Sequence, residues 1–290
     1  MHIKQLCKTC RYIYLTKIVF YKNIFYLIYN SCIFAHKQCQ KQMSFIKPNI
    51  IKFDLLTSTN DKMSELIKKD NLPEFSIVTT ENQSIGKGQM GNSWESEPGK
   101  NLTFSIFCKP NFIPINEQFK ITQIITLSII NSLKPILKNI SIKWPNDIYC
   151  GDKKIAGILV ENSLKGSKID DSIIGVGLNV NQTEFHSDAP NPSSLKLLTN
   201  KEHNLDELLN KILFNFIDIY LDLMQNDNSK IMQEEYMSNL FRNDGFYKYS
   251  DDKETFNAKI IDILSTGHLV LETENGEVIK YAFKEVSFIV

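Results

Sequence analysis

A glycine-rich hexapeptide is the first place where this sequence could do chemistry. Gly86-Lys87-Gly88-Gln89-Met90-Gly91 has three glycines that let backbone N–H groups approach an anion closely, with Lys87 between the first two. The segment matches G-x-G-x-x-G. In a dinucleotide-binding fingerprint a helix must follow this pattern, but Pro98 and Gly99 disfavour a helix here. It also lacks the Gly-Lys-Ser/Thr ending of a Walker loop. On these residues alone, an anion cradle and a mobile hairpin connection are equally open.

Three further clusters bring charged, amide or small residues to strand-like runs. Lys143-Trp144-Pro145-Asn146-Asp147 places a lysine, an amide and a carboxylate around a proline. Lys154 opens the mostly apolar run Ile155–Glu161, and a partly desolvated lysine there would act strongly on a nearby phosphate or carboxylate. An ordinary surface lysine at a turn is the alternative. The stretch Gly175–Asn181 has small residues inside a strand pattern, which indicates close approach of a ligand or a bulge.

Hydrophobic periodicity predicts the elements that must position these clusters. Ser58-Thr59-Asn60 supplies capping side chains for a helix with an apolar stripe, and Gly151-Asp152 is typical of a hairpin turn. We expect strands at Asn49–Leu56, Ser76–Thr80, Leu102–Cys108 (half-buried), Ser141–Cys150, Lys154–Asn162 and Ser172–Asn181. We expect further helices at Glu117–Leu137 and from Leu205 to Tyr220, the second amphipathic.

The chain changes character from about Gly245. Only short strands are expected there, at Phe256–Ile263, His268–Thr273 and Val278–Phe283, and Glu274-Asn275-Gly276 is a strong hairpin signal between the last two. The sequence therefore predicts a strand-and-helix domain over residues 43–240 and a small β-module over 241–290. A module of that size holds little stability alone, so we expect it to dock on its neighbour.

Composition narrows the class of protein. The 290 residues are 42% hydrophobic and 23% charged, which excludes disordered, collagenous and coiled-coil chains. The formal net charge is zero, which excludes a globally basic nucleic-acid binder. Beyond residue 42 only Cys108 and Cys150 remain of six cysteines, so the chain is no disulfide scaffold and a reducing, cytoplasmic location is expected.

The first 42 residues are unlike the rest. They hold seven basic residues, no acidic residue and four of the cysteines, so residues 43–290 carry 26 basic against 33 acidic residues, a formal charge of −7. Lys22 interrupts the aromatic stretch Ile18–Ala35, which makes a membrane span costly. We consider a non-native extension upstream of a true start at Met43, a disordered tail, a membrane anchor and a metal knuckle. We assign no chemistry to this segment.

The ordered clusters resemble the biotin protein ligases, in the form without an N-terminal DNA-binding domain. The resemblance runs from about Asn49 to the C-terminus. Its most specific parts are Ser58-Thr59-Asn60, the stretch Gln83–Trp94, Lys143–Asp147 and Lys154–Glu161. It implies an α+β fold with a mixed or antiparallel sheet and flanking helices, like the class II aminoacyl-tRNA synthetases, followed by a small SH3-like β-barrel. It also implies ATP-dependent attachment of biotin to a lysine of a biotin carboxyl carrier domain, through biotinyl-5′-AMP, with ATP and Mg²⁺ as co-substrate and ion.

The resemblance also assigns expected roles to residues. Lys154 and Lys87 would stabilise the negative charge that develops where the biotin carboxylate meets the phosphate. The metal ligands are unknown. Trp94, Trp144 and the strand Gly157–Val160 would wall the biotin pocket. The residues expected at biotin are Ser58, Thr59, Asn60, Gln83, Gly86, Lys87, Gly88, Gln89, Trp94, Lys154 and Gly157. Those expected at the nucleotide are Lys143, Asn146, Asp147 and Asn179. No histidine lies in a motif and no nucleophilic triad is present, which agrees with catalysis by positioning and charge.

Departures from the family pattern and rival functions stay open. Many members have arginines where Lys87, Gln89 and Met90 stand, and the uncharged Gln89 puts tight retention of the adenylate in question. The rivals are a lipoate–protein ligase, a non-catalytic biotin or nucleotide sensor, and a DNA-binding repressor. The last is disfavoured by the acidic 43–290 segment and the lack of a helix-turn-helix pattern in residues 1–42. We therefore expect a carrier protein as partner, no nucleic acid and no membrane, and leave a homodimer open.

Overall fold

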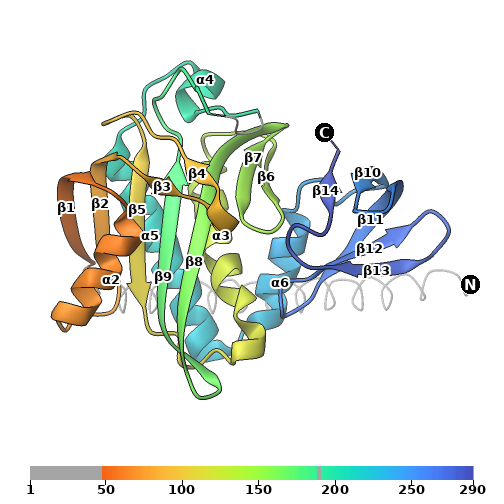
Figure 1. Ribbon diagram of the computed structural model, residues 1–290, viewed down its shortest axis with the longest axis horizontal. Coiled ribbons are helices and arrows are strands. Elements are labelled where there is room, and N and C mark those ends of the chain that lie inside the picture. The colour runs from red at the N-terminus through yellow and green to blue at the C-terminus, as the bar shows by residue number, and fades with distance from the viewer. Residues whose placement is uncertain (1–47, 188–190, 290) are drawn as a thin grey trace, which may run out of the picture. The chain divides into compact units, whose positions relative to one another are not determined.

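Runs of β-branched and apolar residues form a seven-stranded sheet in the computed structural model, which describes residues 48–187 and 191–289 (Figure 1). The strands lie in the order β1-β2-β5-β9-β8-β7-β6. Only β1 and β2 pair in parallel, and every other neighbouring pair in this sheet is antiparallel. The strands are β1 (Asn49–Leu56), β2 (Ser76–Gln83), β5 (Leu102–Cys108), β6 (Ile140–Lys143), β7 (Asp147–Cys150), β8 (Lys153–Lys165) and β9 (Lys168–Leu178).

Helices cover both faces of this sheet. The helix α2 (Thr59–Lys69) packs Met63 against Val78 and Phe107 on one face. The helices α3 (Phe119–Leu133) and α5 (Leu205–Asn226) pack on each other and lie on the opposite face, together with the shorter α6 (Ser229–Ser238) (Figure 1). A five-residue helix, α4 (Leu195–Thr199), follows β9. The expected α+β architecture is confirmed.

The register of the sheet puts small and polar residues in rows on the α2 face. Ser105 of β5 lies opposite Gly175 of β9, which lies opposite Leu159 of β8. The next row runs through Thr103, Gly177, Gly157 and Asp147. Because side chains alternate along a strand, the intervening apolar residues point toward α3 and α5. One face of the sheet therefore builds the core, and part of the other is a floor of small residues.

The C-terminal residues form a second, five-stranded antiparallel sheet in the order β13-β12-β11-β10-β14. This sheet docks on its neighbour, as expected. The indole Nε1 of Trp144 donates to the carbonyl of Gly267 at 2.9 Å, and Gln233 Nε2 donates to the carbonyl of Ile263 at 2.8 Å. The strands are β10 (Tyr247–Ser250), β11 (Thr255–Ile263), β12 (Leu269–Thr273), β13 (Val278–Tyr281) and β14 (Ser287–Phe288). The closed SH3-like barrel and the domain boundary at residue 240 stay predictions.

Three expectations about elements were wrong or incomplete. The single strand expected at Ser141–Cys150 is two strands, β6 and β7, which meet at the turn containing the cis Trp144-Pro145 bond. Strand β5 is buried along all seven residues and not half-buried, because α2 covers the face that its small polar residues occupy. Periodicity also missed the short elements α4, α6, β3 (Gly86–Lys87), β4 (Ser93–Trp94), β10 and β14. The hairpin turns at Gly151 and Gly276 are confirmed, each with a positive φ that favours glycine.

The expectations for residues 1–42 fall outside the described part of the chain. Within residues 48–187 and 191–289, none of the helices combines the length and apolar character of a membrane span.

Candidate active site

A cavity of about 760 Å³ lies over the floor of small residues, between the α2 face of the large sheet and the C-terminal sheet. Thirteen of the fifteen residues expected at biotin or at the nucleotide line it, and the exceptions are Gly86 and Asn179. Of the expected wall, Trp144 and residues 157–159 line the cavity and Val160 does not. Four motifs spread over a hundred residues of chain therefore meet at one place. Their separate roles are taken from a resemblance and stay predictions, but their convergence is a property of the fold.

The N-terminus of α2 forms a polar end of the cavity. Ser58 caps the helix, its hydroxyl accepting from the backbone N–H of Asp61 at 3.4 Å. The backbone N–H of Thr59 donates to Gln83 Oε1 at 2.9 Å, which turns the Nε2 group of Gln83 away from that bond. Ser58, Thr59 and Asn60 are all buried. This end therefore offers several fixed hydrogen-bonding groups on buried residues.

Trp94 covers the glycine floor. A short hairpin pairs β3 (Gly86–Lys87) with β4 (Ser93–Trp94), so the glycine-rich segment is a hairpin connection over the cavity. The indole lies on Gly177 and on Gly157, where an added Cβ would stand 3.0 Å from its Cζ3 atom. The Nε1 atom of Trp94 is buried and has no hydrogen-bond partner in the described chain. Glycines on β8 and β9 thus make the space that this ring occupies.

The cationic end of the cavity is built around Lys154. Its Nζ lies 2.8 Å from Asp147 Oδ1 and 5.8 Å from the centre of the Trp94 ring, and both ion-pair side chains are about one-fifth exposed. A β-bulge in β8 sets the direction of this side chain. Ala156 pairs with Ile148, and Lys154 pairs with Tyr149, the next residue of β7, so Ile155 is an extra residue in β8. Without the extra residue, Lys154 would point to the opposite face of the sheet from Gly157.

Lys143 is a second, partly buried cation at this end. Its Nζ donates to the Tyr149 hydroxyl at 3.2 Å and lies 5.6 Å from the centre of the Phe288 ring, which belongs to the C-terminal sheet. Burial lowers the pKa of Lys143; the nearby Asp147 carboxylate opposes this shift, and repulsion from Lys154 adds to it. An anion placed here would gain more from Lys143 than from an exposed lysine.

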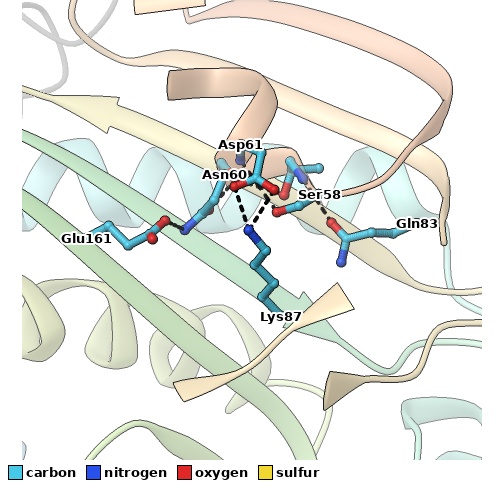
Figure 2. Close-up of polar contacts among 8 residues, drawn as sticks. Ser58, Asn60, Asp61, Gln83, Lys87 and Glu161 are labelled. Atoms are coloured by element: carbon cyan, nitrogen blue, oxygen red, sulfur yellow. Dashed lines mark hydrogen bonds and ion pairs between the residues drawn. The ribbon is translucent and has the colours of Figure 1, made fainter. Parts of the chain in front are cut away.

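Lys87 lies at the cavity rim and is held by a carboxylate. Its Nζ contacts both oxygens of Asp61, at 2.7 and 2.8 Å, and each side chain is about half exposed. The hydrogen bond to Asp61 raises the pKa of Lys87, so this side chain stays charged. We expected the Lys87 ammonium to face an anion, but in this structure it forms an ion pair with Asp61 in the first turn of α2 (Figure 2).

Asn146, Gly86 and Asn179 have structural contacts that limit what they can offer a ligand. Asn146 Nδ2 donates to the carbonyl of Ile158 at 2.6 Å, which ties the turn after β6 to strand β8. Gly86 lies beneath Trp94, where a side chain would collide with the Trp94 backbone. Asn179 does not line the cavity, since its Nδ2 donates to the carbonyl of Ser193 at 2.9 Å. An effect of Asn179 on a nucleotide would act through that loop.

Sequence reasoning missed the wall contributed by the C-terminal sheet. Phe283, Val286, Ser287 and Phe288 line the cavity and lie more than 120 residues beyond Lys154. It also missed Thr103 and Ser105, which are single polar residues on a strand and carry no motif, and it assigned no role to Glu161, the last residue of the Lys154–Glu161 stretch. Only the register could have revealed them.

The charge balance of the cavity favours an anionic ligand. Four lysines line it, against one carboxylate, Asp147, among the described residues. No group of three or more side chains with metal-binding spacing occurs in the part of the chain that the structure describes. Residues 48–187 and 191–289 therefore give no indication of a metal site whose ligands are all protein side chains. A divalent ion carried by phosphate groups needs only one or two carboxylates.

Comparison with solved structures places this fold in a class. The chain is similar to the biotin protein ligase from Aquifex aeolicus, solved in complex with biotin and ATP. That likeness has a TM-score of 0.68 and 25% identity, and covers 82% of this chain and 97% of that one. The ligase from Leishmania major in complex with biotinyl-5-AMP has a TM-score of 0.57 at 21% identity, over 82% and 100% of the two chains. The fold is that of the biotin protein ligases.

A family model matches part of the sequence. Residues 52–179 match the model of the Biotin/lipoate A/B protein ligase family, and the similarity to biotin–protein ligases indicates an enzyme of the ligase class. The Bifunctional ligase/repressor BirA of Bacillus subtilis is 29% identical over 234 residues, which cover 79% of this chain and 70% of that protein. Biotin–protein ligase 1, chloroplastic, of Arabidopsis thaliana is 27% identical over 198 residues, 62% of this chain and 49% of that protein.

Proposed function

We propose that this protein attaches biotin to a lysine of a biotin carboxyl carrier domain, with ATP as co-substrate. The observation that carries the proposal is one cavity with a polar end at the α2 N-terminus and a cationic end at Lys154 and Lys143. Biotin has a polar ureido ring at one end and a carboxylate at the other. The two ends of the cavity match the two ends of this molecule in chemistry.

The polar end favours biotin over lipoate, the rival within the same family. Ser58, Thr59, Asn60 and Gln83 surround a buried space with hydroxyl and amide groups. The ureido group can pair its carbonyl with the Nε2 group of Gln83 and an N–H with the Thr59 hydroxyl. The dithiolane ring of lipoate offers none of these, so it would leave buried polar groups unpaired at a cost of roughly 1–3 kcal/mol each.

The reaction that fits the cavity has two steps. An oxygen of the biotin carboxylate attacks the α-phosphorus of ATP, and pyrophosphate leaves with the electrons of the broken P–O bond. The ε-amine of the carrier lysine then attacks the carbonyl carbon of biotinyl-5′-AMP, and AMP leaves as the amine loses its proton. Lys154 and Lys143 hold the carboxylate and phosphate oxygens together and oppose the negative charge that builds up between them.

Trp94 and the β3–β4 hairpin have the role of excluding water. A mixed acyl–phosphate anhydride is hydrolysed readily, so its shielding matters between the two steps. Mg²⁺ would enter with the triphosphate and would neutralise phosphate charge, and Asp147 is the carboxylate among the described lining residues that could hold it. A cytoplasmic location and the absence of a nucleic-acid partner remain predictions.

Purified protein should release pyrophosphate from ATP-Mg²⁺ only when biotin is present, and should transfer label from biotin to a carrier domain. The matched control is the same carrier domain with its acceptor lysine changed to arginine, which should stay unlabelled. Lipoate in place of biotin should give neither signal. Activity with lipoate alone would establish the rival ligase, and biotin binding without pyrophosphate release would establish a non-catalytic sensor.

The buried position of Lys143 predicts a pH dependence. Because its pKa is lowered, its ammonium loses the proton at a lower pH than an ordinary lysine does, so kcat/KM for ATP should fall as pH rises through that value. A Lys143→Arg variant keeps its charge, and its alkaline fall should shift to higher pH. Lys153→Arg, at an exposed neighbouring strand position, should keep the wild-type profile. An unchanged alkaline limb in Lys143→Arg would contradict this role.

A further inference from the structure

A chain of four hydrogen-bonded side chains runs from the protein surface to the polar end of the cavity. Asn60 Nδ2 donates to Glu161 Oε2 at 2.6 Å, a contact that Figure 2 shows between α2 and strand β8. Asn60 Oδ1 lies 2.6 Å from the hydroxyl of Ser105, and that hydroxyl lies 2.8 Å from Thr59 Oγ1. Ser105 is fully buried, whereas Glu161 is exposed. Neither Ser105 nor Glu161 lines the cavity.

The chemistry of Glu161 fixes the direction of every bond in this chain. An ionised carboxylate only accepts, so Asn60 must present its Nδ2 group to Glu161 and its Oδ1 atom to Ser105. A carbonyl oxygen cannot donate, so the single hydroxyl hydrogen of Ser105 goes to Asn60 Oδ1. Ser105 then meets Thr59 with a lone pair, and Thr59 must donate its hydrogen to Ser105. Toward the cavity, the Thr59 hydroxyl has only lone pairs left.

The sheet holds this chain in place. Ser105 and Gly175 face each other across β5 and β9, and a Cβ at Gly175 would stand 3.0 Å from Asn60 Cγ and closer still to Asn60 Oδ1. The amide of Asn60 therefore fills the space that glycine leaves. With Asn60 fixed by Gly175, Glu161 and Ser105, neither the amide nor the two hydroxyls can exchange donor for acceptor without breaking a short bond.

We propose that Ser105 and Glu161 are positioning residues that fix the Thr59 hydroxyl as an acceptor and so set the specificity of the cavity for a ligand N–H. The inference rests on the proposed function, in which that N–H belongs to the ureido ring of biotin. Gln83 complements it, because its Oε1 is used by the Thr59 backbone and its Nε2 group is left to donate. An acceptor and a donor side by side match the alternating N–H and C=O of a cyclic urea.

Cyclic-carbamate analogues of biotin, each with oxygen in place of one ureido N–H, test this polarity. The measured quantity is the ratio of the two dissociation constants, analogue to biotin, obtained by titration calorimetry. Wild-type protein should reject the analogue whose oxygen faces Thr59 by about 100-fold, since two acceptors then meet in a buried site. In Ser105→Ala the Thr59 hydroxyl is free to turn its hydrogen to the analogue, and the ratio should fall to about tenfold or less.

Two further variants make the test decisive. Ser128→Ala removes an equally buried hydroxyl, bonded to the Ile124 carbonyl at 2.6 Å and outside the cavity, and should leave the ratio at the wild-type value. Glu161→Gln changes an exposed residue and allows the Asn60 amide to rotate by 180°, so the ratio of dissociation constants should fall in this variant too. This variant keeps the test available if Ser105→Ala does not fold. An unchanged ratio in Glu161→Gln and in folded Ser105→Ala, or an equal fall in Ser128→Ala, would overturn the proposal. Wild-type protein that binds biotin selectively but releases no pyrophosphate would overturn the proposed function instead.

Discussion

Lys154→Ala is expected to lose biotin-dependent pyrophosphate release by about 10²–10³-fold, corresponding to about 2.7–4 kcal/mol of transition-state stabilisation. The reason is the position of this ammonium at the cationic end of the cavity, where it is only about one-fifth exposed and lies 2.8 Å from Asp147. Partial exclusion of water strengthens its action on a carboxylate–phosphate centre. The loss should appear in adenylate formation, measured as pyrophosphate release with saturating biotin and ATP.

The neighbouring residue provides a matched control. Lys153 has the same side chain on the same strand, but it is nearly half exposed and does not line the cavity. Lys153→Ala should keep the wild-type rate within about twofold, as most exposed substitutions change little. Thermal unfolding of both variants shows whether the unpaired Asp147 carboxylate weakens the fold. Near-normal pyrophosphate release from a folded Lys154→Ala would refute the role of this lysine.

Gly177→Ala is expected to displace Trp94 from the sheet and to lower the overall rate by about 10²-fold, the size of effect that a small misplacement at a reacting centre can have. The φ angle of Gly177 is not in the left-handed region, so the backbone accepts alanine, but the new methyl group would overlap the indole. If Trp94 cannot pack on Gly177, the β3–β4 hairpin cannot cover the cavity, and water reaches the anhydride.

Two measurements separate this effect from general unfolding. Biotin plus ATP should protect residues 86–99 of the wild type from trypsin cleavage after Lys87, and should fail to do so in Gly177→Ala. Trp94 is one of only two tryptophans, so its exposure should shift the intrinsic fluorescence to longer wavelength. Gly245→Ala, where the nearest atom to an added Cβ is 4.0 Å away, should change neither property. Wild-type protection in Gly177→Ala would contradict the covering role of Trp94.

The local elements were largely predictable from the sequence, and the errors have a common cause. The strand expected at Leu102–Cys108 is present, but its alternating small and polar residues suggested a solvent face. Those residues face α2 and the cavity instead, because burial depends on what packs against a strand and not on the strand itself. The β14 strand, only two residues long, was missed because it has too few residues to show a period.

The sequence by itself determined the motifs, the capped helix start at Ser58 and the hairpin turns, because each depends on residues within a few positions of one another. The tertiary structure alone decided how those motifs work together. The bulge in β8 turns Lys154 toward the cavity, and the pairing of β5 with β9 and β8 brings Ser105 beside Asn60 and Glu161 within reach of α2. Strand register joins residues far apart in the chain, and a shift of one residue sends each side chain to the opposite face.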